Sequence, residues 1–220
     1  ITVLKLDLAS FEGVRSFVAD LKELNRPVAA LINNAGVMTR DSRITTDGFE
    51  QTVQVNYLST ALLSILTAPL IEIGGRIVFT TSLTRLMSRI PEQFPYESNF
   101  SQLGTYGRSK LAITLFAVYL TTVLKTSGIL VECADPGIVN TNMITLNRWF
   151  DRIADVVFRP IISTPSEGAQ STLKALEASE SGLIFHGDET KRVVSILKDK
   201  NMFVNLLNNT LRILNKEKAK

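Results

Sequence analysis

The segment Tyr106-Gly107-Arg108-Ser109-Lys110 holds the strongest candidate for chemistry in this sequence. A spacing of four residues places the tyrosine and the lysine on one face of a helix, one turn apart. A free tyrosine has a pKa of about 10, and a nearby ammonium favours its phenolate form. Such a pair is suited to moving a proton to or from an alcohol or carbonyl oxygen. Because the same spacing also fits an ordinary solvated helix face, the pair needs support from elsewhere in the chain.

Polar and glycine-containing segments follow three short apolar runs of the sequence. The runs with the segments that follow them are Val28–Ile32 with Asn33-Asn34-Ala35-Gly36, Ile77–Thr80 with Thr81-Ser82, and Ile129–Ala134 with Pro136-Gly137. Short, mostly apolar runs are typical of buried parallel strands. Ligands bind at the carboxyl ends of such strands, which is where these polar segments lie.

Strand and helix signals alternate along the whole chain, and they predict the elements that position these residues. Helical periodicity follows Ser10, a good helix cap, and recurs over about 49–70, 106–125 and 166–177. Further strands are expected at Ile1–Leu6 and Leu183–Phe185, and a helix is expected from Lys191 onward. This alternation, with apolar strands, predicts a three-layer α/β domain with a parallel sheet covered on both faces.

Composition excludes several classes of protein. The chain has 220 residues, a net charge of +3, one cysteine and one histidine. A zinc site built on Cys and His lacks ligands, and the absence of an intramolecular disulfide fits a reducing compartment. The charges form no basic stripe interleaved with aromatic residues, so we expect no nucleic-acid partner and no metal site. No run of 18 apolar residues occurs, so no transmembrane helix is predicted.

One polar residue lies inside an otherwise apolar helical stretch. Asn56 occurs in Val53-Gln54-Val55-Asn56-Tyr57, and a buried amide there must be hydrogen-bonded or it costs stability. From the residues alone, a satisfied core amide and a functional amide are both open.

Taken in order along the chain, these motifs resemble the short-chain dehydrogenase/reductase family. The resemblance rests on Asn33-Asn34-Ala35-Gly36, Asn56, Ser82, Tyr106-x-x-x-Lys110 and Pro136-Gly137. The retinol-dehydrogenase-like branch is the most similar, on Leu6-Asp7-Leu8, Asp47-Gly48-Phe49-Glu50, the long gap between Ser82 and Tyr106, and Thr164–Gln170. The resemblance runs from about Ile1 to Gly187 and implies a Rossmann-type fold.

The resemblance implies a catalytic role for four residues. Tyr106 would be the general acid/base, and Lys110 would lower its pKa and hydrogen-bond the nicotinamide ribose. Ser82 would hold the substrate oxygen, and Asn56 would support a water relay to Lys110. The reaction implied is hydride transfer between NADP or NAD and an alcohol/carbonyl substrate, which the apolar segment from Trp149 to Phe158 suggests is lipophilic.

The resemblance also implies a set of cofactor contacts. Besides Tyr106 and Lys110, the cofactor-binding residues would be Asp7 near the adenine, Asn33, Ala35 and Gly36 along the cofactor, and Pro136, Gly137 and Thr141 around the nicotinamide. Glycine at position 36 would let the main chain approach the cofactor closely.

The sequence departs from the family's pattern in two places. No glycine-rich G-x-G-x-x-G turn lies upstream of Asp7 or elsewhere. We therefore expect residues 1–220 to form a single but incomplete, N-terminally truncated domain, with the strand at Ile1–Leu6 cut off from its neighbours. Asp135, in place of an uncharged residue or histidine before Pro136, is expected to alter polarity near the nicotinamide.

Three origins of a short chain stay open: a fragment, a gene model cut short, or a genuine short form. The main rival to catalysis is a non-catalytic form that acts only by interaction.

The basic, amphipathic tail from Phe203 to Lys220 fits either a packed helix or a helix on a lipid surface. We expect an intracellular protein, cytoplasmic or peripherally associated with a membrane or lipid droplet, and a homodimer stays open.

Overall fold

A five-stranded sheet forms the centre of the protein. The computed structural model describes residues 1–96, 99–139, 162–163 and 165–218. The strands follow the order β1-β2-β3-β6-β7, with bounds Val28–Asn33, Ile71–Thr80, Leu130–Asp135, Leu183–His186 and Glu189–Arg192. The first four run parallel, and β7 pairs antiparallel with β6. A small second sheet pairs β4 (Ile138–Val139) with β5 (Ile162–Ser163).

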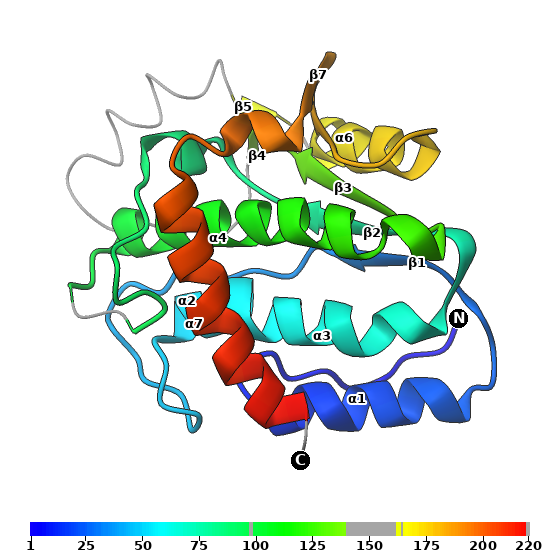
Figure 1. Cartoon of the computed structure of the whole chain (residues 1–220), viewed down its shortest axis with the longest axis horizontal. Coiled ribbons are helices and arrows are strands. Elements are labelled where there is room, and N and C mark those ends of the chain that lie inside the picture. Colours follow the sequence, from blue (N-terminus) through cyan, green and yellow to red (C-terminus); the bar gives the residue numbers. More distant parts are fainter. Residues whose placement is uncertain (97–98, 140–161, 164, 219–220) are drawn as a thin grey trace.

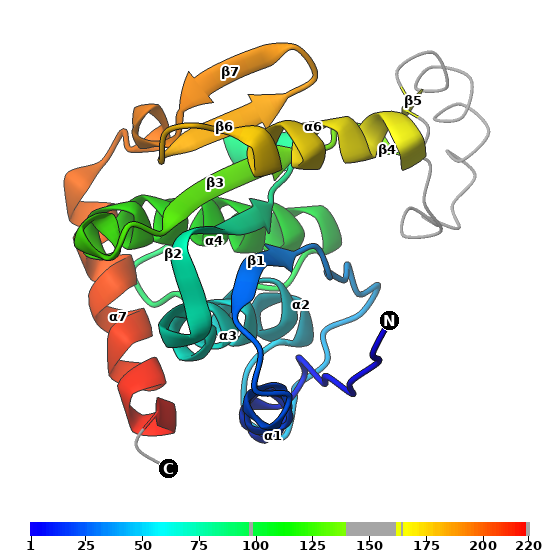
Figure 2. The same cartoon turned by 90° about the vertical axis from the view of Figure 1, so that its right-hand side faces the viewer.

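Helices cover both faces of this sheet (Figures 1 and 2). One layer contains α1, α2, α3, α4 and α7, with bounds Phe11–Glu23, Gln51–Val53, Ser59–Thr67, Gln102–Val123 and Lys200–Lys218. On the opposite face, α6 (Pro165–Glu177) packs on β2, β3 and β6. The expected three-layer α/β fold is therefore confirmed.

The first helix begins where the sequence indicated. The Ser10 side chain accepts a hydrogen bond from the Gly13 main-chain nitrogen at 3.3 Å, which is a standard N-cap. A second carboxylate completes the cap from a distant part of the chain, because Asp47 Oδ2 accepts from the Phe11 nitrogen at 2.8 Å. An acidic group is favourable there because the helix N-terminus carries a partial positive charge.

The core lies between the sheet and α4. Ile77, Phe79 and Val131 of the strands are fully buried, as are Leu115 and Phe116 of the helix. Because α4 is covered by the sheet on one side and by α7 on another, nearly every residue from Ser109 to Val118 is buried. This makes α4 a rigid support for the residues at its N-terminal end.

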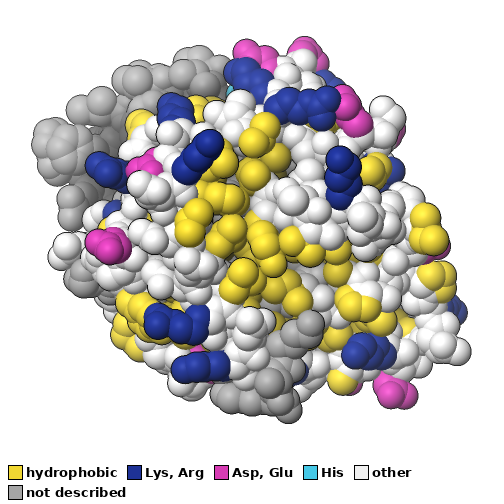
Figure 3. Space-filling model, viewed as in Figure 1, with side chains coloured by type: hydrophobic (Ala, Val, Ile, Leu, Met, Phe, Trp, Pro, Cys, Tyr) yellow, Lys and Arg dark blue, Asp and Glu magenta, His cyan; other side chains and the backbone are white. Residues whose placement is uncertain are grey.

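The C-terminal helix α7 is a packed helix, as one of the two interpretations of the tail predicts. Leu206, Ile213 and Leu214 are buried in the main core, and the Tyr57 hydroxyl lies 2.6 Å from Thr210 Oγ1. Apolar side chains form a band across the face that carries α4 and α7 (Figure 3). The most buried apolar residues of α7 therefore pack against protein.

One predicted element is wrong, and another begins later than predicted. Ile1–Leu6 forms no strand, although Leu6 and Leu8 pack partly against the core. An extended run becomes a strand only when a neighbour's main chain pairs with it, and no described strand lies beside it. Lys191 and Arg192 belong to β7 rather than to a helix, because Lys191 pairs with Ile184 across the β6–β7 hairpin.

The long helical stretch over 49–70 is interrupted. A π-helical turn, η1 (Gln54–Leu58), separates α2 from α3, and a 3₁₀ turn, η2 (Ala68–Leu70), follows. The segment Gln51–Leu70 is long and apolar enough to cross a membrane by length and composition. However, 78% of its most apolar window is buried inside the fold, as expected for a core helix.

Candidate active site

Tyr106 and Ser82 meet at the carboxyl edge of the sheet. Tyr106 lies in the second turn of α4, and Ser82 follows the end of β2, where it caps the 3₁₀ turn η3 (Leu83–Met87). Their side chains are hydrogen-bonded to each other. Ser82 Oγ also accepts from the Thr84 nitrogen at 3.3 Å and from Thr84 Oγ1 at 3.1 Å. With both lone pairs accepting, the Ser82 hydrogen is free to be donated to Tyr106 or to a substrate oxygen.

Close packing of η3 on α4 brings these two residues together. A Cβ at Gly107 would lie 2.2 Å from Ser88 Oγ and 3.1 Å from the Thr84 carbonyl oxygen. A side chain at position 107 would therefore push the segment after Ser82 away from the helix. Glycine beside Tyr106 has a packing reason that the sequence motif alone does not show.

Lys110 is buried one turn along the same helix. Its side chain is only 4% exposed, and Nζ donates to the Thr80 carbonyl oxygen at 2.8 Å. Nζ also lies 5.7 Å from the centre of the Tyr106 ring. Burial lowers the pKa of Lys110 to about 8, against the opposing influence of Asp135. Lys110 therefore stays mainly protonated at neutral pH, but it gives up its proton more easily than a free lysine.

The pKa of Tyr106 is raised in this structure, which corrects the expectation that Lys110 would lower it. Burial is the largest cause, the hydrogen bond from Ser82 opposes it, and the charge of Asp135 raises the pKa further. Burial disfavours the charged phenolate. The Lys110 ammonium donates its hydrogen bond to the Thr80 carbonyl oxygen. In this arrangement Tyr106 is a protonated hydroxyl at neutral pH.

Asn56 is a fully satisfied buried amide. Its Oδ1 accepts from the Val37 nitrogen at 2.7 Å, and its Nδ2 donates to the Val37 carbonyl at 2.8 Å and to Ser109 Oγ at 3.0 Å. It lies in the π-helical turn η1, a feature often found at functional sites. Asn56 therefore fixes the loop after β1 to the helix that carries Tyr106. Its part in a water relay stays a prediction.

Gly36 lies where Asn56 and Lys110 come together. A Cβ at this position would be 3.2 Å from Asn56 Oδ1 and 3.4 Å from Lys110 Nζ. The predicted residues Gly36, Asn56 and Lys110 are thus brought into one cluster. Ala35, next to Gly36, is exposed at the carboxyl end of β1.

The side-chain oxygen of Asn33 is a hydrogen-bond acceptor without a partner among the described residues. Its Nδ2 donates to Ser64 Oγ at 3.1 Å, whereas its Oδ1 is buried without a hydrogen-bond partner among the described residues. A buried unpaired oxygen costs stability unless a ligand or water satisfies it. Asn33, Gly36, Tyr106 and Lys110 lie at the same edge of the sheet, and they would hold the nicotinamide end of a dinucleotide there.

Asp135 is enclosed by protein, and its expected effect on polarity near the nicotinamide stays a prediction. It is fully buried and forms an ion pair with the nearly buried Arg85. Its Oδ1 accepts from the Gly137 nitrogen at 3.0 Å and lies 3.7 Å from His186 Nδ1. Asp135 thereby shapes the Pro136–Gly137 turn, in which Gly137 has a φ of +72°.

One predicted cofactor residue, Asp7, lies outside this cluster. Asp7 lies in the turn before α1, where its Oδ1 accepts from the Ala9 nitrogen at 2.9 Å, and its role near the adenine stays a prediction. Thr141 and the apolar segment from Trp149 to Phe158 lie outside the described residues.

Sequence reasoning missed the contributions of Ser109 and Arg85. Ser109 bridges Asn56 Nδ2 and the Tyr106 carbonyl, to which its Oγ donates at 2.7 Å. Its place inside the Tyr106–Lys110 motif was the available signal. Arg85 carries no such signal, because its partner Asp135 is 50 residues away in the chain.

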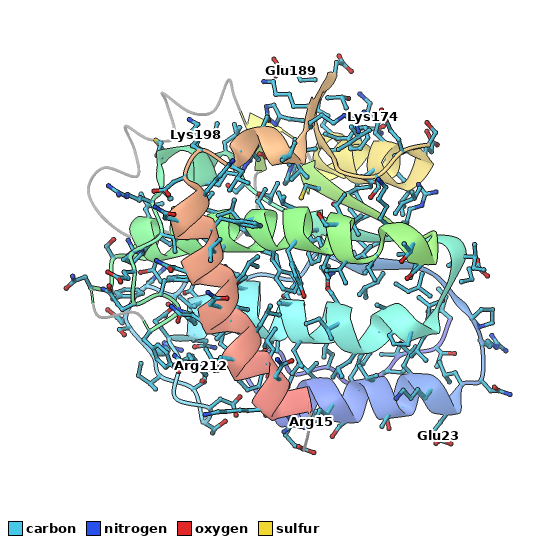
Figure 4. All side chains as sticks on the ribbon, in the orientation of Figure 1. Arg15, Glu23, Lys174, Glu189, Lys198 and Arg212 are labelled. Atoms are coloured by element: carbon cyan, nitrogen blue, oxygen red, sulfur yellow. The ribbon has the colours of Figure 1, made fainter. Side chains whose placement is uncertain are left out.

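A cavity of about 460 Å³ adjoins this edge of the sheet. Leu83 and Arg85, which follow Ser82, and Leu111, which follows Lys110, contribute to its walls. Ile184, Ile196 and Met202 make further walls apolar, while Lys198 and Glu189 line it as charged residues (both labelled in Figure 4). An apolar cavity with a few polar groups is the usual form of a small-molecule site.

Comparison with known proteins assigns the chain to a family. A family model for short chain dehydrogenases matches residues 1–149. Human polyprenol dehydrogenase is 32% identical over 200 residues, which cover 84% of this chain and 61% of that protein. Mouse retinol dehydrogenase 11 is 36% identical over 177 residues, 78% of this chain and 55% of that protein. The chain belongs to the short-chain dehydrogenase family, an oxidoreductase family that uses NAD or NADP.

Solved structures agree with this assignment. A protein from Mycobacterium paratuberculosis superposes with a TM-score of 0.72 at 26% identity, over 96% of this chain and 74% of that one. A short-chain dehydrogenase from Burkholderia cenocepacia in complex with NADP has a TM-score of 0.62 at 24% identity, over 83% and 74%. The resemblance to retinol-dehydrogenase-like members is confirmed by the relatives' names. The chain spans 56% and 61% of the mouse and human polyprenol dehydrogenases.

Proposed function

We propose that this chain carries the nicotinamide-binding and substrate-binding part of an oxidoreductase that interconverts an alcohol and a carbonyl compound. The observation that carries the proposal is the hydrogen-bonded Tyr106–Ser82 pair, with the buried Lys110 one turn away on the same helix. On a solvated helix face Lys110 would be exposed, whereas here it is 4% exposed and donates to the Thr80 carbonyl oxygen at the end of β2. The cofactor would be NADP or NAD.

Ser82, Tyr106 and Lys110 each have a different role in the proposed carbonyl reduction. Ser82 donates its free hydrogen to the carbonyl oxygen and so holds it beside the Tyr106 hydroxyl. Tyr106 then donates its proton to that oxygen as negative charge develops on it. The bound nicotinamide supplies the hydride that reduces the carbonyl carbon. The nearby Lys110 ammonium stabilises the phenolate that remains, and in the oxidative direction the same groups take the proton back.

The substrate proposed is a lipophilic alcohol or the corresponding carbonyl compound. The walls of the adjoining cavity contain Leu83, Leu86, Leu111, Ile184, Ile196 and Met202. Two relatives carry the names polyprenol dehydrogenase and retinol dehydrogenase, and both of these alcohols are apolar. Burial of a hydrocarbon chain against such walls gains about 25 cal/mol for each Å² of apolar surface removed from water.

The test combines cofactor binding with reduction of a retinoid or isoprenoid aldehyde. NADPH and NADH are titrated into the chain and into a form extended upstream, and nicotinamide fluorescence is followed. Tyr106→Phe should retain cofactor binding and lose about 100- to 10,000-fold in kcat. Tyr119→Phe changes a tyrosine on the same helix that packs against Phe116, and it should leave kcat unchanged.

Two results would count against this function. Full activity in Tyr106→Phe would remove the acid/base role. Absence of cofactor binding in both forms, with both folded, would favour a protein that acts only by interaction.

A further inference from the structure

Two buried charges behind the Tyr106–Ser82 pair connect the ends of neighbouring strands. Arg85, in η3 after β2, is 6% exposed, and Asp135, at the end of β3, is fully buried. One guanidinium nitrogen, Nη1, donates both to the Ser82 carbonyl oxygen at 2.7 Å and to Asp135 Oδ2. Asp135 in turn accepts from the Gly137 nitrogen. A single chain of hydrogen bonds therefore runs from Ser82 to the Pro136–Gly137 turn.

Neither charge takes up or releases a proton in the proposed reaction, although Arg85 also contributes to the wall of the adjoining cavity. Asp135 is fully buried, so it is not available to a substrate as a base. Nη1 of Arg85 is already hydrogen-bonded to the Ser82 carbonyl oxygen and to the Asp135 carboxylate. Burying two charges is costly, and an apolar pair of similar size would often be as stable. Retention of the pair at the active edge of the sheet therefore calls for a reason besides stability.

We propose that the Arg85–Asp135 pair is a positioning device that holds Ser82 against Tyr106 and balances the charge beside that tyrosine. The proposal rests on the proposed function, and it adds two positioning residues to it. Anchoring the Ser82 carbonyl fixes the main chain from which the Ser82 hydroxyl projects. Anchoring Gly137 fixes the turn on the other side of the same edge.

The electrostatic part of the proposal follows from what faces Asp135. Arg85 reaches it from η3, His186 from β6, and Tyr106 and Lys110 of α4 both sense its charge. Besides burial, the negative charge of Asp135 opposes ionisation of Tyr106. The positive charge of Arg85, paired with Asp135, has the opposite sign and should favour it. Neutralising one partner should therefore shift the ionisation of Tyr106 in one direction, and neutralising the other should shift it in the opposite direction.

The first experiment titrates the Tyr106 phenol by ultraviolet absorbance, with Tyr106→Phe subtracted to isolate its signal. Asp135→Asn should lower the ionisation midpoint, because it removes a negative charge and leaves Arg85 uncompensated. Arg85→Met should raise it, because Asp135 is then unbalanced. The double variant Arg85→Met/Asp135→Asn leaves no unpaired charge and should return the midpoint towards that of the original protein. This titration needs no turnover, so it stands apart from any failure of the proposed function.

The second experiment measures kcat and KM in the form that binds cofactor. The double variant should lose about 100-fold in kcat with little change in KM, since a displacement of about 1 Å at a catalytic group costs that much. The matched control is the exposed pair Arg192–Glu180, in which the arginine likewise reaches a main-chain carbonyl, that of Ser181. Arg192→Met/Glu180→Gln should change neither kcat nor the midpoint.

Two outcomes overturn the proposal. One is a folded double variant, verified by circular dichroism, with unchanged kcat. The other is a pair of folded single variants whose Tyr106 midpoints coincide with that of the original protein.

Discussion

Replacing Lys110 by methionine should stabilise the protein at neutral pH, while it removes the ammonium that is proposed to stabilise the Tyr106 phenolate. The ammonium is 4% exposed, and burial lowers its pKa from 10.5 to about 8. This difference of about 2.5 pH units corresponds to about 3 kcal/mol by which the folded state disfavours the charged lysine. In Lys110→Met the Thr80 carbonyl loses its hydrogen-bond donor, and this loss lowers the free energy of unfolding by about 1 kcal/mol. The net gain at pH 7 is therefore about 2 kcal/mol.

The sign of the pH dependence follows from which state binds more protons. Because the pKa is lower in the folded state, the unfolded chain holds more protons between pH 8 and 10.5, and stability rises with pH there. Below pH 8 both states are protonated and the cost of burying the ammonium is fully present. In Lys110→Met this dependence is absent. The advantage of the variant should thus shrink from about 2 kcal/mol at pH 7 to about zero at pH 10.

Urea unfolding at a series of pH values measures this difference directly. The exposed Lys125, changed to methionine, is the control, and its effect on the free energy of unfolding should not vary with pH in the same way. The reasoning fails if Lys110→Met is less stable than the original protein at pH 7. It also fails if the difference between the two proteins stays constant from pH 7 to 10.

Three further substitutions probe the supports of the site. Gly107→Ala should destabilise the fold by about 1–2 kcal/mol, because its methyl group meets Ser88 Oγ, and Ser88→Ala in the same chain should restore part of the loss in a thermal melt. Asn56→Ala leaves both polar groups of the Val37 main chain unpaired, so urea unfolding should show a loss of about 2–3 kcal/mol, with weaker cofactor binding. Leu214→Ala, at a position 1% exposed, should cost about 2–5 kcal/mol and make α7 the first site of limited proteolysis.

The sequence sufficed for features that depend on local periodicity. Tyr106 and Lys110 lie one turn apart on α4, as a spacing of four requires, and Ser82 follows a buried strand. Parallel strands bring their carboxyl ends to one edge, so the meeting of Asn33, Ser82 and Asp135 at that edge could be inferred without coordinates.

Features that depend on distant partners could not be inferred in this way. The run Ile1–Leu6 has the alternation of a strand, yet a strand also needs a neighbour to pair with. The ion pair of Arg85 with Asp135 joins residues 50 positions apart, and no periodicity links them. The same holds for the pKa of Tyr106, because its burial depends on how η3 packs on α4.

The burial of Lys110 is itself an argument that this edge of the sheet evolved for chemistry. A lysine kept for stability would be exposed or paired with a carboxylate, whereas the hydrogen bond of Lys110 is to a main-chain carbonyl. Asp135, the negative charge that acts on it, is already paired with Arg85. Methionine would fill the same space at lower cost, so selection for stability alone would not retain the ammonium. A lysine with a pKa lowered to about 8 beside a partly buried tyrosine suits proton transfer near neutral pH.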